Sequence, residues 1–418
     1  MTDKPRFFYG YTVVIISFFM MMVIMGLHAC FGIFFKPIIE ELGWTRTVTS
    51  GAYSLSQIVG GLLGIVMGGL NDRLGPRVVM TLCGLLTALG YILMWQTHAV
   101  WQLYLFYGIL IGVSVAVFTP LLSTVARWFI QRRGMMTGVV MAGAGVGMII
   151  LPLLINWLIF AYNWRIACLI LGIVILIVVV LTAQFLKRDP SKVGQAAYGE
   201  SDTVEEGLKL GTKGFSAKEA MLTRQFWLFF ATLICYGFCI FSIQVHIAPY
   251  ATDIGISTTN AAIILSTIGG ASIIGQIGLG SAGDKIGYKR TFLIGLVLIV
   301  LAIFTLILAK ELWAFFLFAI LLGVAFGNCS TQESPIVAWL FGLASHGVLL
   351  GFLVFSFTIG AAIGPVVFGY IFDVTGNYQL AFLVYAAISI VAIILTILLK
   401  PPTSESTLKT INSKALQA

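Results

Sequence analysis

Three ionisable side chains stand inside long apolar stretches of this chain, and their chemistry is the most specific that the sequence offers. They are His28, His246 and Glu333. Because a charged group is costly at the depth of a bilayer, such a residue is a functional candidate by default. A histidine titrates near neutral pH and can carry a proton or donate a hydrogen bond to a carboxylate. A carboxyl group in a low-dielectric environment holds its proton more readily than in water, as a proton-coupling site requires.

Each of these residues also has a purely structural interpretation, and both interpretations stay open. His28 shares a helical face with Phe31, so it can simply pack there. His246 can be satisfied by a carbonyl group near the outer end of its helix. Glu333 can be the ion-pair partner of Arg127 or of another basic residue at the same end of its helix.

The elements that must position these side chains are membrane spans. Of the 418 residues, 59% are hydrophobic and 10% are charged, whereas soluble domains have about 25% charged residues. The mean hydropathy is +1.03. Twelve apolar runs each approach the ~20 residues that are needed to cross a bilayer. They cover about residues 10–37, 48–70, 77–97, 101–126, 135–159, 164–186, 225–250, 258–280, 291–309, 313–339, 348–371 and 378–399.

The distribution of Lys and Arg predicts the orientation in the membrane. With the N-terminus inside, the outer loops carry only Lys36, Arg46, Arg165 and Lys310 of the 24 basic residues. This bias predicts a multi-pass protein of the cell (inner) membrane with both termini in the cytoplasm. The net charge of +8 follows from the same bias, so it gives no reason to expect a nucleic-acid partner. The first apolar run is too long for a cleavable signal peptide.

Other chemistries find no support in the sequence. The six cysteines all fall inside predicted helices, which argues against a disulfide framework. Cys235 and Cys239 have helical spacing, but no further metal ligands cluster near them. The chain has no phosphate-binding glycine loop and no evident nucleophile–base pair. We therefore expect no metal site, no cofactor and no enzyme activity.

A polar stretch and a duplicated pattern divide the chain into related halves. The predicted parts are an N-terminal six-helix bundle (1–186), a cytoplasmic linker (187–224) and a C-terminal six-helix bundle with a short tail (225–418). One charged pattern occurs in both halves, each time at the end of an apolar run. It consists of Gly68, Asp72, Arg73, Gly75 and Arg77 in the first copy, and of Asp284 and Arg290 in the second. Duplicated halves in a membrane chain are typical of transporters.

The first copy of this pattern strongly resembles the loop signature of the major facilitator superfamily, and the resemblance extends over essentially the whole chain. It implies an all-α membrane protein with twelve transmembrane helices in two pseudo-symmetric six-helix bundles. The pattern's own chemistry agrees, because Asp72 can close a helix end beside Arg73 and Arg77. Gly68 and Gly75 permit close helix approach and a sharp turn. We expect this loop to act as a charged latch between the bundles.

Within that superfamily the chain is similar to the bacterial monocarboxylate transporters and oxalate/formate antiporters. The phrases that carry this similarity lie at 31–37, 41–46, 127–129, 132–134, 334–342, 364–365 and 372–378. The resemblance implies a secondary active transporter that moves a small organic acid by alternating access, with proton coupling through His246 or Glu333. It implies a lipid bilayer and a small-molecule substrate as partners. The expected substrate-binding residues are His28, Phe31, Phe118, Thr119, His246, Tyr250, Ser272, Gln276, Asn328, Thr331 and Phe355.

One departure from the family pattern changes the substrate expectation. Where these relatives carry a helix-eight arginine that pairs with the substrate carboxylate, this chain has Gln276. Residues 348–371 also lack the lysine on which oxalate exchange relies. A carrier of a neutral or zwitterionic metabolite is therefore an open alternative. A non-transporting sensor on a transporter scaffold is a further alternative, although the tail after Lys400 is short for a signalling domain.

Overall fold

A computed structural model of the chain describes residues 8–129, 133–199, 215–309, 311–342 and 346–400. These residues form long helices and no named strand. Twelve helical segments of the described chain are long and apolar enough to cross a membrane, which confirms the predicted all-α membrane fold. They are Gly10–Leu42, Arg46–Asn71, Pro76–Met94, Val100–Val125, Met135–Ala161, Trp164–Ala183, Arg224–Asp253, Thr258–Leu279, Tyr288–Ile307, Leu312–Phe341, Val348–Thr375 and Gln379–Ile397.

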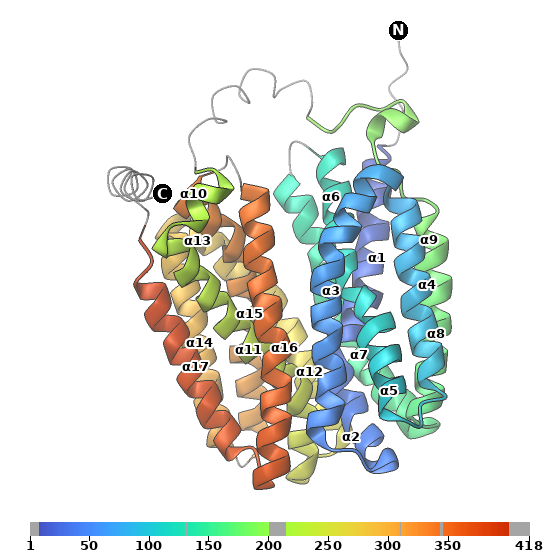
Figure 1. Cartoon of the computed structure of the whole chain (residues 1–418), viewed down its shortest axis with the longest axis vertical. Coiled ribbons are helices and arrows are strands. Elements are labelled where there is room, and N and C mark those ends of the chain that lie inside the picture. The colour runs from blue at the N-terminus through green and yellow to red at the C-terminus, as the bar shows by residue number, and fades with distance from the viewer. Residues whose placement is uncertain (1–7, 130–132, 200–214, 310, 343–345, 401–418) are drawn as a thin grey trace, which may run out of the picture.

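The helices form two groups, which are coloured blue to green and yellow-green to red in Figure 1. The first bundle contains α1 (Gly10–Ala29), α2 (Phe31–Leu42), α3 (Arg46–Leu74), α4 (Pro76–Met94), α5 (Val100–Leu103), α6 (Phe118–Trp128), α7 (Arg133–Ala161), α8 (Trp164–Ile175) and α9 (Leu181–Ala183). The second bundle contains α11 (Arg224–Asp253), α12 (Thr258–Ile274), α13 (Gly280–Ile286), α14 (Tyr288–Ile307), α15 (Leu312–Phe341), α16 (His346–Thr375) and α17 (Gln379–Ile397). A short helix, α10 (Ala217–Met221), precedes the second bundle.

Several spans are interrupted, which hydropathy alone does not predict. The first span breaks at Cys30, between α1 and α2, and extends to Gly43, whose φ of 67° ends it in the left-handed region. The other interruptions are π-helices at Tyr104–Leu110, Leu176–Val180 and Gly275–Leu279, and a 3₁₀ segment at Ile111–Val117. Because π-helical turns are frequent at functional sites, the turn that contains Gln276 is a candidate part of a binding site.

The two bundles touch along α3–α16, α7–α12 and α2–α11. Glycines allow this contact: a Cβ atom added to Gly269 of α12 would lie 2.4 Å from the Cβ of Met148 in α7. A Cβ on Gly369 of α16 would lie 2.9 Å from the carbonyl oxygen of Arg46 in α3. Small residues are needed where helix backbones approach this closely in a membrane. The interface between the bundles is therefore a close helix–helix contact.

The two ends of the molecule differ. We call the end where α6 ends and α10 lies the linker end, and the other end, where α2 lies, the opposite end (Figure 1). At the linker end α10 lies near the end of α15, because the amide of Phe215, just before α10, donates to the carbonyl of Phe341 over 2.9 Å. The first part of the linker packs on the first bundle, since the amide of Tyr198 donates to the carbonyl of Trp128 over 2.9 Å. The bundle boundaries at residues 186 and 225 stay a prediction.

Candidate functional site

Glu333 is a half-buried carboxylate in the part of α15 toward the linker end. In the described part of the chain it makes no ion pair and no hydrogen bond. The side chains of Tyr236 in α11 and of Cys329, one turn earlier in α15, lie near it. Arg127, the alternative partner considered from the sequence, instead pairs with Asp189, with 3.3 Å between Nη1 and Oδ1. The structure therefore places the carboxylate of Glu333 inside a membrane helix without a cation beside it among the described residues.

His28 lies in an aromatic cluster within the first bundle. Its Nε2 is 3.0 Å from the Oγ of Ser56, which donates its own hydrogen to the carbonyl of Tyr53 over 2.6 Å. The His28 ring is 5.0 Å from the ring of Tyr53, centroid to centroid. The ring centroid of Phe31 lies 5.3 Å from that of Tyr53 and 4.4 Å from that of Tyr107. This geometry fits the packing interpretation of His28 and Phe31, because both side chains are buried and His28 has a protein partner.

His246 is buried toward the opposite end of α11, and both of its ring nitrogens have partners. Nε2 is 2.8 Å from the carbonyl oxygen of Pro365, and Nδ1 is 2.8 Å from the hydroxyl of Tyr378. A carbonyl can only accept, so Nε2 carries the hydrogen, and Nδ1 of the neutral ring accepts from Tyr378. Burial raises the pKa of the Tyr378 phenol, which keeps this hydroxyl protonated as a donor.

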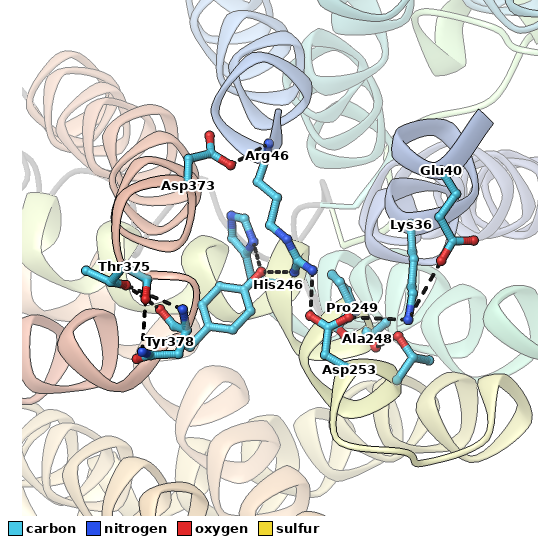
Figure 2. A network of polar contacts seen from close by, with 12 residues as sticks. Lys36, Glu40, Arg46, His246, Ala248, Pro249, Asp253, Asp373, Thr375 and Tyr378 are labelled. Carbon is cyan, nitrogen blue, oxygen red and sulfur yellow. Dashed lines mark hydrogen bonds and ion pairs between the residues drawn. The ribbon is translucent and has the colours of Figure 1, made fainter. Parts of the chain in front are cut away.

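A charged network joins this histidine to the first bundle at the opposite end, as Figure 2 shows. Arg46, at the start of α3, donates through Nη1 to the hydroxyl of Tyr378 over 2.5 Å. Its Nη2 lies 2.5 Å from the Oδ2 of Asp253, at the end of α11. Lys36 of α2 pairs with the same carboxylate at 3.3 Å. The side chain of Arg46 is only 11% exposed, so the network is part of the contact between the bundles.

Sequence reasoning missed this network because each charge stands at the edge of an apolar run and looks like an ordinary loop residue. The one available signal was that Lys36 and Arg46 are basic residues on the predicted outer side, where basic residues are rare. Tyr250, an expected substrate-binding residue, packs among aromatic rings of the second bundle, and its role in binding stays a prediction. Its ring centroid is 5.9 Å from Phe315 and 5.0 Å from Phe382.

The polar residues expected on the eighth and tenth spans differ in how they are used. Ser272 donates to the carbonyl of Gly269 over 2.7 Å, and the Nδ2 of Asn328 donates to the carbonyl of Thr291 in α14 over 2.7 Å. Thr331 donates to a carbonyl of its own helix. Gln276 is half-buried in the π-helix and makes no hydrogen bond within the described chain. Within the described chain, Gln276 therefore has its whole amide group available to a solute, and Asn328 has only its Oδ1 without a partner.

Three further expected pocket residues lie in different surroundings. Phe118 is half-buried and Thr119 is exposed at the start of α6, and Phe355 is half-buried in α16. Thr119 faces α3, because a Cβ atom added to Gly68 would lie 3.2 Å from its Cγ2. The structure therefore brings Thr119 to the latch pattern rather than to His246.

The latch pattern itself lies at the linker end of α3. Gly75 turns the chain between α3 and α4 with a φ of 84°, as expected for a glycine at a sharp turn. Arg77 donates through Nε to the Oε1 of Gln184 over 2.7 Å, inside the first bundle. Arg73 and Arg290 are exposed. The side chains of Asp72 and Asp284 lie outside the described part of the structure, so the latch stays a prediction.

A small cavity lies where the two bundles meet near the centre of the molecule. Its walls are Met148 of α7, Ile240 and Gln244 of α11, Leu265 and Ile268 of α12, and Leu322 and Phe326 of α15. Gln244 also reaches across the interface, donating to the carbonyl of Ala29 over 3.2 Å. The cavity has a volume of about 10 Å³, which is room for one water molecule and too little for an organic solute.

The chain is similar to a family of known membrane transporters. The model of the Major Facilitator Superfamily matches residues 13–281 and 250–416. Monocarboxylate transporter 13 of Rattus norvegicus is 28% identical over 395 residues, covering 92% of this chain and 88% of that protein. Monocarboxylate transporter 11 of Homo sapiens is 27% identical over 374 residues, covering 86% of this chain and 76% of that protein.

Two solved structures share the fold. The nucleoside transporter NupG superposes with a TM-score of 0.74 at 15% identity, covering 94% of this chain and 99% of that chain. A bacterial homologue of the human lysosomal transporter Spinster, in an inward-facing and unoccupied conformation, gives a TM-score of 0.70 at 16% identity, covering 95% of both chains. The matched family model spans both bundles and nearly the whole chain, and the curated relatives are transporters. The chain therefore belongs to the Major Facilitator Superfamily and is a multi-pass membrane transporter that is similar to the monocarboxylate transporters named above.

Proposed function

We propose that this transporter moves a small organic acid across the cytoplasmic membrane by alternating access and that protons drive it. The names of the monocarboxylate transporters to which the chain is similar support an organic acid as substrate. The observation that carries the proton coupling is Glu333, a carboxylate in a membrane helix with no cation beside it in the described chain. Such a group can take up and release a proton as its exposure changes.

Alternating access is supported by the unequal contacts at the two ends of the molecule. At the opposite end Arg46 and Lys36 of the first bundle bind Asp253 of the second. At the linker end the described latch residue Arg77 bonds within its own bundle. A carrier that is closed at one end can expose its centre to the other side by rocking one bundle against the other. The bias of basic residues supports a cytoplasmic linker end.

Gln276 favours a second candidate, a carrier of a neutral or zwitterionic metabolite. Its amide is unbonded within the described chain and is presented by a π-helical turn. An amide can pair with a hydroxyl or another amide, but it cannot supply the charge-assisted hydrogen bond that stabilises a desolvated carboxylate. For an organic acid the missing charge has to come from another residue, or the carboxylate has to be carried in its protonated form together with Glu333.

A ligand panel tests the proposal and separates the two candidates. Purified transporter is melted in the presence of organic acids, amino acids and nucleobases, because a ligand that binds only the native state raises the melting temperature. At 100 times the dissociation constant the stabilisation is about 2.7 kcal/mol, which is readily measured. We expect stabilisation by small organic acids that grows as the pH is lowered. Stabilisation by neutral or zwitterionic compounds alone would favour the second candidate.

A further inference from the structure

The N-terminus of α3 has its first backbone donors satisfied from two different bundles. A helix leaves its first N–H groups without partners inside the helix. Thr45, directly before α3, accepts from the amide of Val48 through its Oγ1 over 3.2 Å. The amides of Arg46 and Thr47 donate instead to the two carboxylate oxygens of Asp373, over 3.0 Å and 2.8 Å.

Asp373 reaches this helix from the other bundle, near the end of α16. Its carboxylate also accepts the hydroxyl hydrogen of Thr47. One turn earlier, Gly369 makes the approach possible, since a Cβ atom there would lie 2.8 Å from the Oγ of Ser50 in α3. An acidic side chain at a helix N-terminus both accepts the free amides and interacts favourably with the helix dipole. Asp373 does this across the bundle interface.

The side chain of Arg46, whose amide Asp373 caps, makes further contacts with the second bundle. Arg46 binds Asp253 and Tyr378, and its guanidinium carbon lies 3.7 Å from the centroid of the Phe372 ring. All of these partners belong to the second bundle, and Figure 2 shows Asp253 and Tyr378 at the guanidinium end of Arg46. The first turn of α3 is therefore held by the ends of α11 and α16 and by the residue before α17.

A second ion pair at the same end has similar chemistry but stays inside one bundle. Arg165 donates through Nε to the Oε1 of Glu41 over 2.8 Å, and the indole of Trp164 donates to the other oxygen of Glu41. All three residues belong to the first bundle. Removing the charge of Glu41 therefore disturbs the opposite end without touching the contact between the bundles, so this pair is a matched control for Asp373.

We propose that Asp373 is a removable helix cap that closes the carrier at the opposite end. When the bundles separate there, Asp373 leaves α3 and the amides of Arg46 and Thr47 meet water. This inference rests on the alternating access proposed above, but it concerns which residues hold the closed state. It can therefore be tested without a substrate and without measuring transport.

The test combines hydrogen exchange with a distance between the bundles. Spin labels are placed at Gln96 of the first bundle and Glu311 of the second, two exposed loop positions at the opposite end. Five of the six native cysteines are buried, and Cys235→Ser removes the half-buried one. Asp373→Asn turns one of the two acceptor oxygens into an NH2 group that cannot accept an amide hydrogen, so we expect the amides of residues 46 and 47 to exchange about five- to tenfold faster, as for the loss of one capping hydrogen bond. We also expect a larger population of long label distances.

The controls decide between a gate and a local cap. Glu41→Gln should leave both the α3 exchange and the label distances unchanged. Thr47→Val removes the hydroxyl that donates to Asp373 but keeps the backbone amide. It should change the α3 exchange and the label distances in the same direction as Asp373→Asn but by less, and it replaces that variant if Asp373→Asn does not fold. Faster α3 exchange with unchanged distances in these variants would make the cap merely local. An equal opening in Glu41→Gln would make it a general charge effect, and either result overturns the proposal.

Discussion

At the residue scale, His246 and Glu333 of the second bundle are engaged in opposite ways. Both ring nitrogens of His246 have partners, Tyr378 and Pro365, whereas the carboxylate of Glu333 has none among the described residues. A group whose hydrogen bonds are already made must break them before it can exchange a proton or bind a solute. Glu333 is therefore the residue that we propose for the mobile proton, whereas His246 is fixed by two hydrogen bonds inside the second bundle.

Replacement of Glu333 by glutamine should separate exchange from accumulation. Glu333→Gln keeps the size and hydrogen-bonding capacity of the side chain but cannot release a proton. In reconstituted vesicles we expect substrate exchange to continue while accumulation driven by a proton gradient falls to the equilibrium level. Glu311→Gln, the same change in an exposed loop, should leave both rates unchanged. If gradient-driven accumulation survives in Glu333→Gln, the carboxylate is structural.

Replacement of Gln276 by arginine should reveal the charge of the solute. A hydrogen bond to a charged group contributes about 1.5–3 kcal/mol, so Gln276→Arg should tighten the binding of a small carboxylate roughly 10- to 100-fold. If the natural solute is neutral, an unpaired cation in the site should instead abolish its transport. Binding constants for the wild type and the variant measure this directly. No change for either class of ligand would mean that position 276 does not face the site.

The sequence predicted some of the candidate residues but not their hydrogen-bond partners. Glu333, His246 and Gln276 stood out because polar groups are rare inside apolar runs. Their partners did not, because Tyr378, Pro365 and the network around Arg46 are brought together by folding and have no fixed spacing along the chain. The hydrogen bond from the Nδ2 of Asn328 to the carbonyl of Thr291 in α14 was not predictable either, because the direction of a helical side chain depends on how its helix is rotated.

At the scale of elements, the crossing of α12 and α15 sets the position of the π-helix that carries Gln276. A Cβ atom on Gly327 of α15 would lie 1.9 Å from the carbonyl oxygen of Ser272, and one on Gly275 would lie 2.2 Å from that of Val324. Backbones this close leave no room for a side chain. The number of spans followed from hydropathy, but the π-helical turns did not, because they have the same apolar composition as the α-helices around them.

Filling this crossing should destabilise the second bundle. Gly327→Ala forces α15 away from α12, and overpacking of a tight contact costs about 1–3 kcal/mol. Gly351→Ala is the matched control, because a Cβ atom at that helical position meets nothing within 4 Å. Thermal unfolding of the purified variants should show a lower midpoint for Gly327→Ala and a wild-type midpoint for Gly351→Ala. Equal midpoints would contradict the close crossing.

At the scale of the whole molecule, the two bundles are joined by glycine-lined helix contacts and by charges at the end opposite the linker. The duplicated pattern at residues 68–77 and 280–290 predicted two related halves, and the helix order agrees with that expectation. The closed end was not predictable, because Arg46, Asp253 and Asp373 lie far apart in the sequence and meet only when the bundles dock. Charged contacts that can break at this end are what the proposed alternating access requires.

Uptake by reconstituted vesicles measures whether protons drive this carrier and whether it moves an organic acid. The organic acid that best stabilises the purified protein is supplied outside the vesicles, with an inward proton gradient and with or without a protonophore. The proposed function predicts accumulation above the equilibrium level with the gradient, collapse of that accumulation with the protonophore, and no uptake in vesicles without protein. Uptake that is the same with and without the gradient, or that occurs only for a neutral metabolite, would contradict a proton-driven carrier of organic acids.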